Sequence, residues 1–250
     1  MDVIRIKKNT ESTPSRRRRK SEGLRIHQAI ACKLGSQILT GHYPPGANLG
    51  GEIDASEKLG VSRTAYREAI RILIAKGLVD SRPKAGTHVL PRRRWNLLDP
   101  DILAWMFSES PDEEFVRDLF ELRGIIEPEA AALAALRASD DHLIAMEDAL
   151  DGMRRYGLAR PEGQAADQEF HSAILDAAGN RALTSLVGSV GAAVRWTTYF
   201  KQNLSPHPRN SLPEHEAVFH AIAARDPEAA RRSMAHLLLL AKGDLVEIIA

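Results

Sequence analysis

Three histidines and one aspartate have side chains of the types and spacing that bind a metal ion. Asp167 and His171 stand four residues apart in a stretch of helical pattern, so both project from one face of a helix. His215 and His236 each belong to a later helical stretch, among apolar residues expected to face inward. Burying so many polar groups without partners is costly, and one shared divalent ion would satisfy them. Imidazole and carboxylate ligands suit Zn²⁺, Ni²⁺, Mn²⁺ or Fe²⁺, of which we expect Zn²⁺.

Spacing alone leaves two alternatives to this metal site open. An inward-facing histidine is also common as a hydrogen-bonded core residue without any ion. A bound ion also activates water in hydrolases, so a metalloenzyme is a further hypothesis. The C-terminal half contains neither a G-x-S-x-G nor an H-E-x-x-H motif, and we therefore do not expect an enzyme.

An arginine on an apolar helix face indicates a site for a small acid. Arg123 lies near Leu119 and Ile126 in a predicted helix, and a guanidinium group can hold a carboxylate through two parallel hydrogen bonds. The alternative is a salt bridge to Glu127, one helical turn further on. Arg195 is a second candidate for the wall of the same effector-binding site.

The elements that must position these side chains are helices. After residue 95 the chain is rich in Ala and Leu at helical spacing, interrupted at Pro, Gly and Asn. We expect helices over 100–108, 112–138, 139–155, 161–177, 181–203, 211–224 and 227–248. Such a series without a strand pattern predicts an all-α bundle.

The N-terminal part of the chain predicts a different architecture. Apolar residues recur at helical spacing over 24–39, a short helix is expected over 54–59, and Ser62 is a suitable N-cap for a helix over 63–76. Residues 78–90 then have the pattern of a β-hairpin. Three helices followed by such a wing predict a winged helix-turn-helix, so the fold class is mainly α, with a helical bundle after this DNA-binding domain.

Charge divides the chain in the same place. Residues 1–94 contain 20 Lys and Arg against 8 Asp and Glu, whereas residues 95–250 contain 14 against 25. A basic surface favours a polyanion, because Lys and Arg release the counterions condensed on DNA. In a helix-turn-helix the start of the second helix enters the major groove. The predicted DNA-binding residues are therefore Arg63, Thr64 and Arg67 on that helix, with Gly86 and Thr87 at the wing tip.

Composition indicates a folded protein and the cellular compartment in which we expect it. Apolar residues make up 44% of the chain, enough for buried cores. We find no apolar run long enough to span a membrane and no secretory signal. The single cysteine, Cys32, cannot form an internal disulfide, and we expect a cytoplasmic protein with no membrane partner. The predicted parts are a disordered basic tail (1–22), the winged helix-turn-helix (23–91), a linker with a short helix (92–111) and the bundle (112–250).

Three motifs of the N-terminal part resemble those of the GntR family of bacterial transcription regulators. They are Pro-Pro-Gly at 44–46, Val-Ser-Arg-Thr-x-x-Arg-Glu-Ala at 61–69 and Gly-Thr-x-Val at 86–89. The resemblance implies a homodimer on a palindromic double-stranded operator, with Arg63 and Arg67 as the main contacts. One departure is Ile53, where the family often has an arginine that touches DNA. The operator sequence therefore does not carry over from the family.

The bundle resembles the effector domain, named FCD, of the fatty-acid-regulator-like branch of that family. The matching signatures are Glu121-Leu122-Arg123 with Glu127, Asp167-x-x-Phe170-His171, Glu214-His215, and Asp226 leading to His236. The resemblance implies that Asp167, His171, His215 and His236 bind a divalent metal, which carboxylate effectors then coordinate.

The segment 92–107 is similar to the linker of repressors that control sugar-acid catabolism, especially those of the galactonate type. It shares with them the pattern Trp-Asn-x-Leu-Asp-x-Asp-x-Leu. The resemblance implies a sugar acid as the class of effector. We therefore expect a repressor that is released from its operator when a galactonate-like acid binds at the metal and Arg123, with Arg195 as a further candidate contact. A metal-responsive regulator and an activator with the same fold stay open as alternatives.

Overall fold

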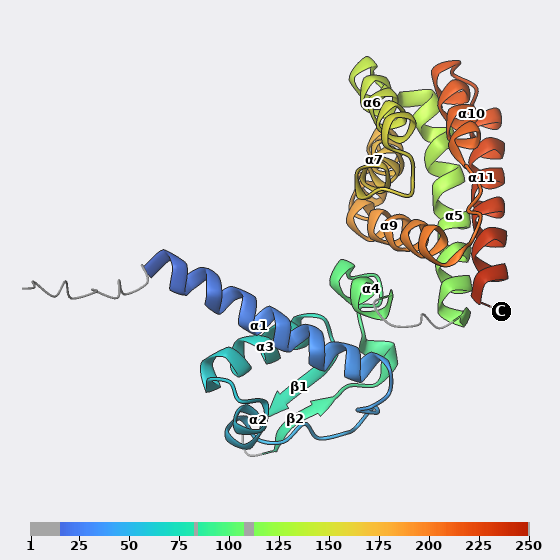
Figure 1. Ribbon diagram of the computed structural model, residues 1–250. Helices are drawn as coiled ribbons and strands as arrows, with labels where there is room; N and C mark the ends of the chain where they lie inside the picture. The colour runs from blue at the N-terminus through green and yellow to red at the C-terminus, as the bar shows by residue number, and fades with distance from the viewer. Residues whose placement is uncertain (1–15, 83–84, 108–112, 250) are drawn as a thin grey trace, which may run out of the picture. The chain divides into compact units, whose positions relative to one another are not determined.

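The chain folds as two compact units that divide between Trp95 and Asn96 (Figure 1). A computed structural model describes residues 16–82, 85–107 and 113–249. The dividing point lies inside the segment that we predicted as a linker.

The N-terminal unit is a winged helix-turn-helix. It contains helices α1 (Arg16–Leu39), α2 (Glu52–Leu59) and α3 (Arg63–Ala75), then strands β1 (Val79–Arg82) and β2 (Gly86–Val89). Helix α1 packs on α3 through Ile30, Leu34 and Ile38 on one side and Ala69 and Leu73 on the other, all buried. The strands pair antiparallel, with Val79 opposite Val89 and Arg82 opposite Gly86. This architecture confirms the predicted fold of the N-terminal part.

Two local signals fix the turn between α2 and α3. Gly60 ends α2 in the left-handed conformation, at a φ of 66°, which glycine adopts without a steric penalty. Ser62 then caps α3, because its side chain accepts a hydrogen bond from the backbone N–H of Ala65 at 3.2 Å. The turn therefore holds the start of α3 at a defined angle to α2.

The start of α1 differs from the expectation. We predicted that residues 1–22 form a disordered tail, but α1 begins at Arg16, so the basic run Arg16–Lys20 is helical. Arginine and lysine are good helix formers, which explains how the helix extends through this run. Residues 1–15 of the predicted tail lie outside the described residues.

The C-terminal unit is helical throughout the residues described. Its helices are α4 (Pro100–Phe107), α5 (Glu113–Arg137), α6 (Asp140–Tyr156), α7 (Pro161–Ala177), α8 (Arg181–Thr184), α9 (Val187–Leu204), α10 (Leu212–Ala223) and α11 (Pro227–Ile249). Helix α5 runs alongside α11, α6 packs on α7, and α7 contacts α9 (Figure 1). The predicted all-α bundle is confirmed, although the single helix expected over 181–203 is divided into α8 and α9.

The short helix α4 is part of the bundle. We placed it in a linker, but Phe107 at its end stacks on Trp196 of α9 with ring centroids 6.3 Å apart. Phe107 also meets Phe200 edge-on at 5.6 Å, and Ile102 and Leu103 are fully buried. Apolar burial therefore ties α4 to the C-terminal unit.

Candidate metal centre and DNA-binding surface

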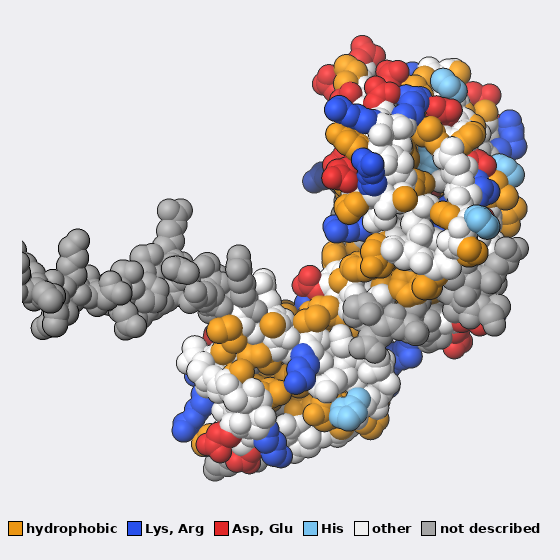
Figure 2. Space-filling view, viewed as in Figure 1, with side chains coloured by type: hydrophobic (Ala, Val, Ile, Leu, Met, Phe, Trp, Pro, Cys, Tyr) orange, Lys and Arg blue, Asp and Glu red, His pale blue; other side chains and the backbone are white. Residues whose placement is uncertain are grey.

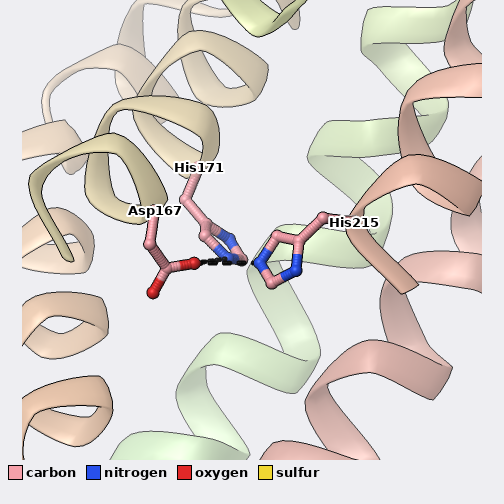
Figure 3. Close-up of side chains that lie close together, drawn as sticks. All are labelled: Asp167, His171 and His215. Atoms are coloured by element: carbon pink, nitrogen blue, oxygen red, sulfur yellow. Dashed lines mark ion pairs between the residues drawn. The ribbon is translucent and has the colours of Figure 1, made fainter. Parts of the chain in front are cut away.

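Helices α7 and α10 bring three potential metal ligands together inside the C-terminal unit. Asp167 and His171 project from one face of α7, and His215 reaches them from α10 (Figure 3). Each side chain offers one ligand atom, and these atoms lie within 4.8 Å of one another. All three residues are at least 97% buried. The predicted pair on α7 and the predicted ligand on α10 therefore form one cluster, which we call the triad.

The hydrogen bonds of both histidines leave the same ring nitrogen for a metal. His215 Nδ1 lies 2.7 Å from the backbone carbonyl oxygen of Ser211, and His171 Nδ1 lies 2.5 Å from Glu127 Oε2. Because these partners are acceptors, each Nδ1 carries the proton and each Nε2 keeps its lone pair. Both Nε2 atoms lie toward Asp167 Oδ1, at 2.9 Å from His215 and 3.8 Å from His171. This is the tautomer in which Nε2 can bind a metal.

Asp167 is held in a matching way. Its second oxygen, Oδ2, accepts a hydrogen bond from Thr198 Oγ1 at 2.7 Å, which leaves Oδ1 toward the histidines. Burial by itself raises the pKa of Asp167, but positive charge on the rings of His215 and His171 and the hydrogen bond from Thr198 lower this pKa below its ordinary value. A divalent ion at the same place would likewise favour the ionised carboxylate.

An unsatisfied atom supports a bound ion at the triad. His215 Nε2 lies 2.9 Å from Asp167 Oδ1, but with the ring proton on Nδ1 it cannot donate to this oxygen, and it has no hydrogen-bond partner among the described residues. A buried polar atom without a partner is costly, and a divalent cation between these atoms would satisfy it. Two imidazoles and one carboxylate suit the same transition metals that we named from the sequence. The residues present therefore fit a divalent metal, whose identity the ligand set does not decide.

Arg123 and Glu127 form a buried ion pair beside the triad. Arg123 Nε donates to Glu127 Oε1 at 2.6 Å, and Nη1 donates to Thr197 Oγ1 at 3.3 Å. Burial by itself raises the pKa of Glu127, but the guanidinium of Arg123 and the ring of His171 outweigh it and lower the pKa to about 2. The salt bridge that we left open as an alternative is therefore present, and it extends to the triad through His171.

One small cavity joins the triad to Arg123. Its volume is about 30 Å³, close to that of one water molecule. Besides Arg123 and the triad, the polar side chains that line it are Thr197, Thr198, Lys201 and Ser211. Sequence reasoning missed these four and the link from Glu127 to His171. Lys201 had a usable signal, since it follows Thr197 by one helical turn on the buried face of α9.

His236 does not join the triad. We predicted it as a fourth ligand, but its side chain is exposed on α11. The buried face of this helix carries Leu237 and Leu238, which line the cavity instead. Consecutive residues of a helix differ by about 100° in direction, so one position separates an inward side chain from an outward one. His236 lies in a shallow outer hollow with Glu214 and Arg232.

Arg195 also lies outside the cavity. Its side chain is exposed, whereas Val194 and Thr197 of the same helix face inward. The reason is again helical direction, since Arg195 stands between two buried positions without sharing their face. Arg123 is thus the one predicted effector-binding residue that the structure places beside the triad.

The predicted DNA contacts of α3 are exposed at the beginning of that helix. Arg63, Thr64 and Arg67 all have exposed side chains. Arg67 borders a hollow of about 660 Å³ between α3 and the wing, and Gly86 and Thr87 border it from the other side. The structure therefore brings Arg67 and the two wing residues to one hollow, with Arg63 and Thr64 outside it.

The two wing residues are placed differently from each other. Gly86 has a φ of 88°, and a Cβ there would lie 2.9 Å from Asn48 Oδ1, so only glycine fits. Thr87 is buried, and its hydroxyl donates to Ser81 Oγ at 3.3 Å across the hairpin. The side chain of Thr87 thus supports the wing, whereas the lack of a side chain at Gly86 lets the wing pack closely against Asn48.

The surface of the C-terminal unit carries many acidic side chains. They gather at the end of the unit that carries α6 (Figure 2). Exposed acidic residues of α6 are Asp140, Asp141, Glu147, Asp148 and Asp151. Like charge repels DNA phosphates, so DNA binding belongs to the N-terminal unit. Among the residues described, no helix is long and apolar enough to cross a membrane.

Comparisons with known proteins agree with this division. The model of bacterial regulatory proteins of the gntR family matches residues 26–89, and the FCD domain model matches residues 118–239. The galactonate operon transcriptional repressor of Escherichia coli is 33% identical over 222 residues, which cover 88% of this chain and 96% of that protein. The Uxu operon transcriptional regulator of E. coli is 28% identical, covering 89% of this chain and 88% of that protein.

A solved structure shares the fold. That of E. coli McbR/YncC covers 90% of this chain and 97% of its own, with a TM-score of 0.52 at 18% identity. The named relatives are transcription regulators, and none supports the metalloenzyme alternative. The winged helix-turn-helix, the helical bundle with its triad, and the 33% identity over most of both chains lead to one conclusion: this chain belongs to the GntR family as a DNA-binding transcription regulator with an FCD domain.

Proposed function

We propose that this regulator is a homodimeric repressor of a sugar-acid catabolic operon, released from its operator when a galactonate-like acid binds the C-terminal unit. The observation that carries the proposal is the meeting of the triad and Arg123 at one buried cavity. Two relatives whose names refer to the galactonate and Uxu operons support the class of effector. A cytoplasmic location follows from this role.

The groups around the cavity suit a hydroxylated monocarboxylate. A divalent ion held by Asp167, His171 and His215 would supply a Lewis acid for a carboxylate oxygen. Glu127 and Thr197 use only part of the N–H donors of Arg123, so its guanidinium can also hold that carboxylate. The hydroxyl of Ser211 and the ammonium donors that Lys201 does not use for Asp244 are available in the lining for sugar hydroxyls.

The size of the cavity provides a route from binding to release. A sugar acid is several times larger than about 30 Å³, so the helices that line the cavity must move when it binds. An acid that binds only the expanded arrangement shifts the protein toward it. In a dimer, such a shift changes the spacing of the two recognition helices, which must match two half-sites on the duplex. We expect Arg63 and Arg67 to contact the operator, with Thr64, Gly86 and Thr87 beside them.

Thermal stability of the metal-loaded protein tests the effector site. A ligand that binds the folded state raises the unfolding midpoint, by ~2.7 kcal/mol of stability at a hundred times its Kd. We expect one member of a panel of aldonic, aldaric and uronic acids to raise the midpoint, and a chelator to abolish the rise. If no acid raises the midpoint with Zn²⁺, Ni²⁺, Mn²⁺ or Fe²⁺ present, the proposal fails.

A second candidate is a regulator that responds to the metal itself. The small volume of the cavity favours it, because an ion fits there without any movement of helices. In that case operator affinity would change with metal concentration and would stay the same when any organic acid is added. The same panel, read out as operator binding, separates the two functions. The sign of regulation, repression or activation, is read from transcription of the target operon.

A further inference from the structure

Among the described residues of the C-terminal unit, Glu127 is the one carboxylate that contacts both a metal ligand and the predicted effector arginine. Its Oε2 accepts from His171 Nδ1 at 2.5 Å, and its Oε1 accepts from Arg123 Nε at 2.6 Å. Its side chain is 2% exposed, so water does not screen either contact. A rotation of this carboxylate therefore moves the histidine and the arginine together.

The other two triad residues are held by groups that, among the described residues, form no hydrogen bond with Arg123. Ser211 supports His215 through a backbone carbonyl, and Thr198 supports Asp167 through a neutral hydroxyl. A carboxylate behind a metal-bound histidine fixes the ring orientation and makes the imidazole a stronger ligand. Of the three triad residues, only His171 is supported by a group that also contacts Arg123.

We propose that Glu127 is a positioning residue that couples metal binding in the triad to carboxylate binding at Arg123. With a divalent ion held by the triad, the hydrogen bond from His171 Nδ1 would strengthen and fix the Glu127 carboxylate. The fixed carboxylate then holds the guanidinium of Arg123 with its remaining donors toward the cavity. Because linkage is reciprocal, an acid bound at Arg123 raises metal affinity by the same factor. The coupling rests on the proposed effector site, whereas the support of His171 does not.

Two substitutions of Glu127 separate its roles. Glu127→Ala removes both contacts, and we expect metal affinity, measured by competition with a chromophoric chelator, to fall ~10–100-fold. Glu127→Gln keeps only one acceptor oxygen, so it serves His171 or Arg123 but not both. We expect it to abolish the coupling, measured as the ratio of metal affinities with and without galactonate. The matched controls are Glu129→Ala and Glu129→Gln, because Glu129 is exposed on the same helix and bonds Arg231 instead.

The support of His171 has a readout that needs neither a variant nor an acid. In metal-free wild-type protein labelled with ¹⁵N-histidine, NMR should show His171 with its proton on Nδ1 and Nε2 unprotonated. The proton on Nε2 instead would overturn the proposal, even if the Glu127 variants fail to fold. So would a metal affinity of folded Glu127→Ala equal to that of Glu129→Ala.

The two proposals fail in different ways. If no sugar acid binds, the proposed effector fails, while the chelator competition and the NMR measurement still decide whether Glu127 supports the metal ligand. If galactonate binds but the ratio of metal affinities is the same in Glu127→Gln as in wild type, the coupling is wrong.

Discussion

The two units place their functional side chains in opposite settings. In the N-terminal unit Arg63 and Arg67 are exposed at the start of α3, ready for a partner that arrives from outside. In the C-terminal unit the triad and Arg123 are buried, and hydrogen bonds to neighbouring helices hold His171 and Arg123 in place. An exposed contact tolerates a change of side-chain direction, because the long arginine side chain moves freely in water. A buried ligand does not, and one position along the helix removes it from the site.

The largest expected effect is on metal affinity, and it separates a buried histidine from an exposed one. His215→Ala removes a buried ligand, so we expect metal affinity to fall by more than the ~100-fold that supporting residues reach. His236→Ala removes an exposed imidazole and should leave metal affinity within about twofold of wild type. Chelator competition on both variants measures the difference. Equal losses would show that His236 is a ligand after all.

In the N-terminal unit, substitution of an exposed arginine should change operator affinity alone. Arg67→Ala should weaken operator binding by ~1–3 kcal/mol, while the thermal midpoint and metal affinity stay unchanged because the side chain is exposed. Fluorescence anisotropy with a labelled operator measures the loss. Arg155→Ala in the C-terminal unit is the matched control, since Arg155 is an exposed arginine far along the chain. A similar loss in the control would mean that net charge, not contact, explains the effect.

A glycine pair tests how tightly the start of α7 is packed. A Cβ at Gly163 would lie 1.9 Å from the carbonyl oxygen of Gly157, whereas a Cβ at Gly188 meets nothing within 4 Å. Gly163→Ala should therefore destabilise the protein by ~1–3 kcal/mol. Gly188→Ala should stabilise α9 slightly, since alanine is the better helix former. Urea unfolding compares them, and equal stability of the two variants would contradict the close packing.

The smallest effect is expected on the outer face of α5. Glu129 pairs with Arg231 at 2.7 Å, but both side chains reach water and solvent screens the pair. Glu129→Gln should leave the thermal midpoint unchanged within error. A clear drop in the midpoint would show that this exposed pair stabilises the fold as a buried pair would.

The sequence predicted most reliably what depends on neighbours along the chain. Ser62 as an N-cap and Asp167 with His171 on one helical face follow from local spacing, and the structure contains both. The contact between Glu127 and His171 joins residues 44 positions apart, and no local pattern indicates it. The structure places His236 outside the triad for another reason. Its neighbours on one face of α11, Ala229 and Leu240, are apolar but only partly buried. Apolar residues alone therefore did not identify the buried face of this helix.

Operator affinity tests the central claim most directly. Metal-loaded protein on a labelled operator should lose at least tenfold in affinity when galactonate or a related sugar acid is added, and a chelator should remove this response. The same titration with His215→Ala should show no response to the acid, whereas His236→Ala should respond like wild type. Operator binding that stays constant across the whole panel of acids, with metal present, would contradict the account.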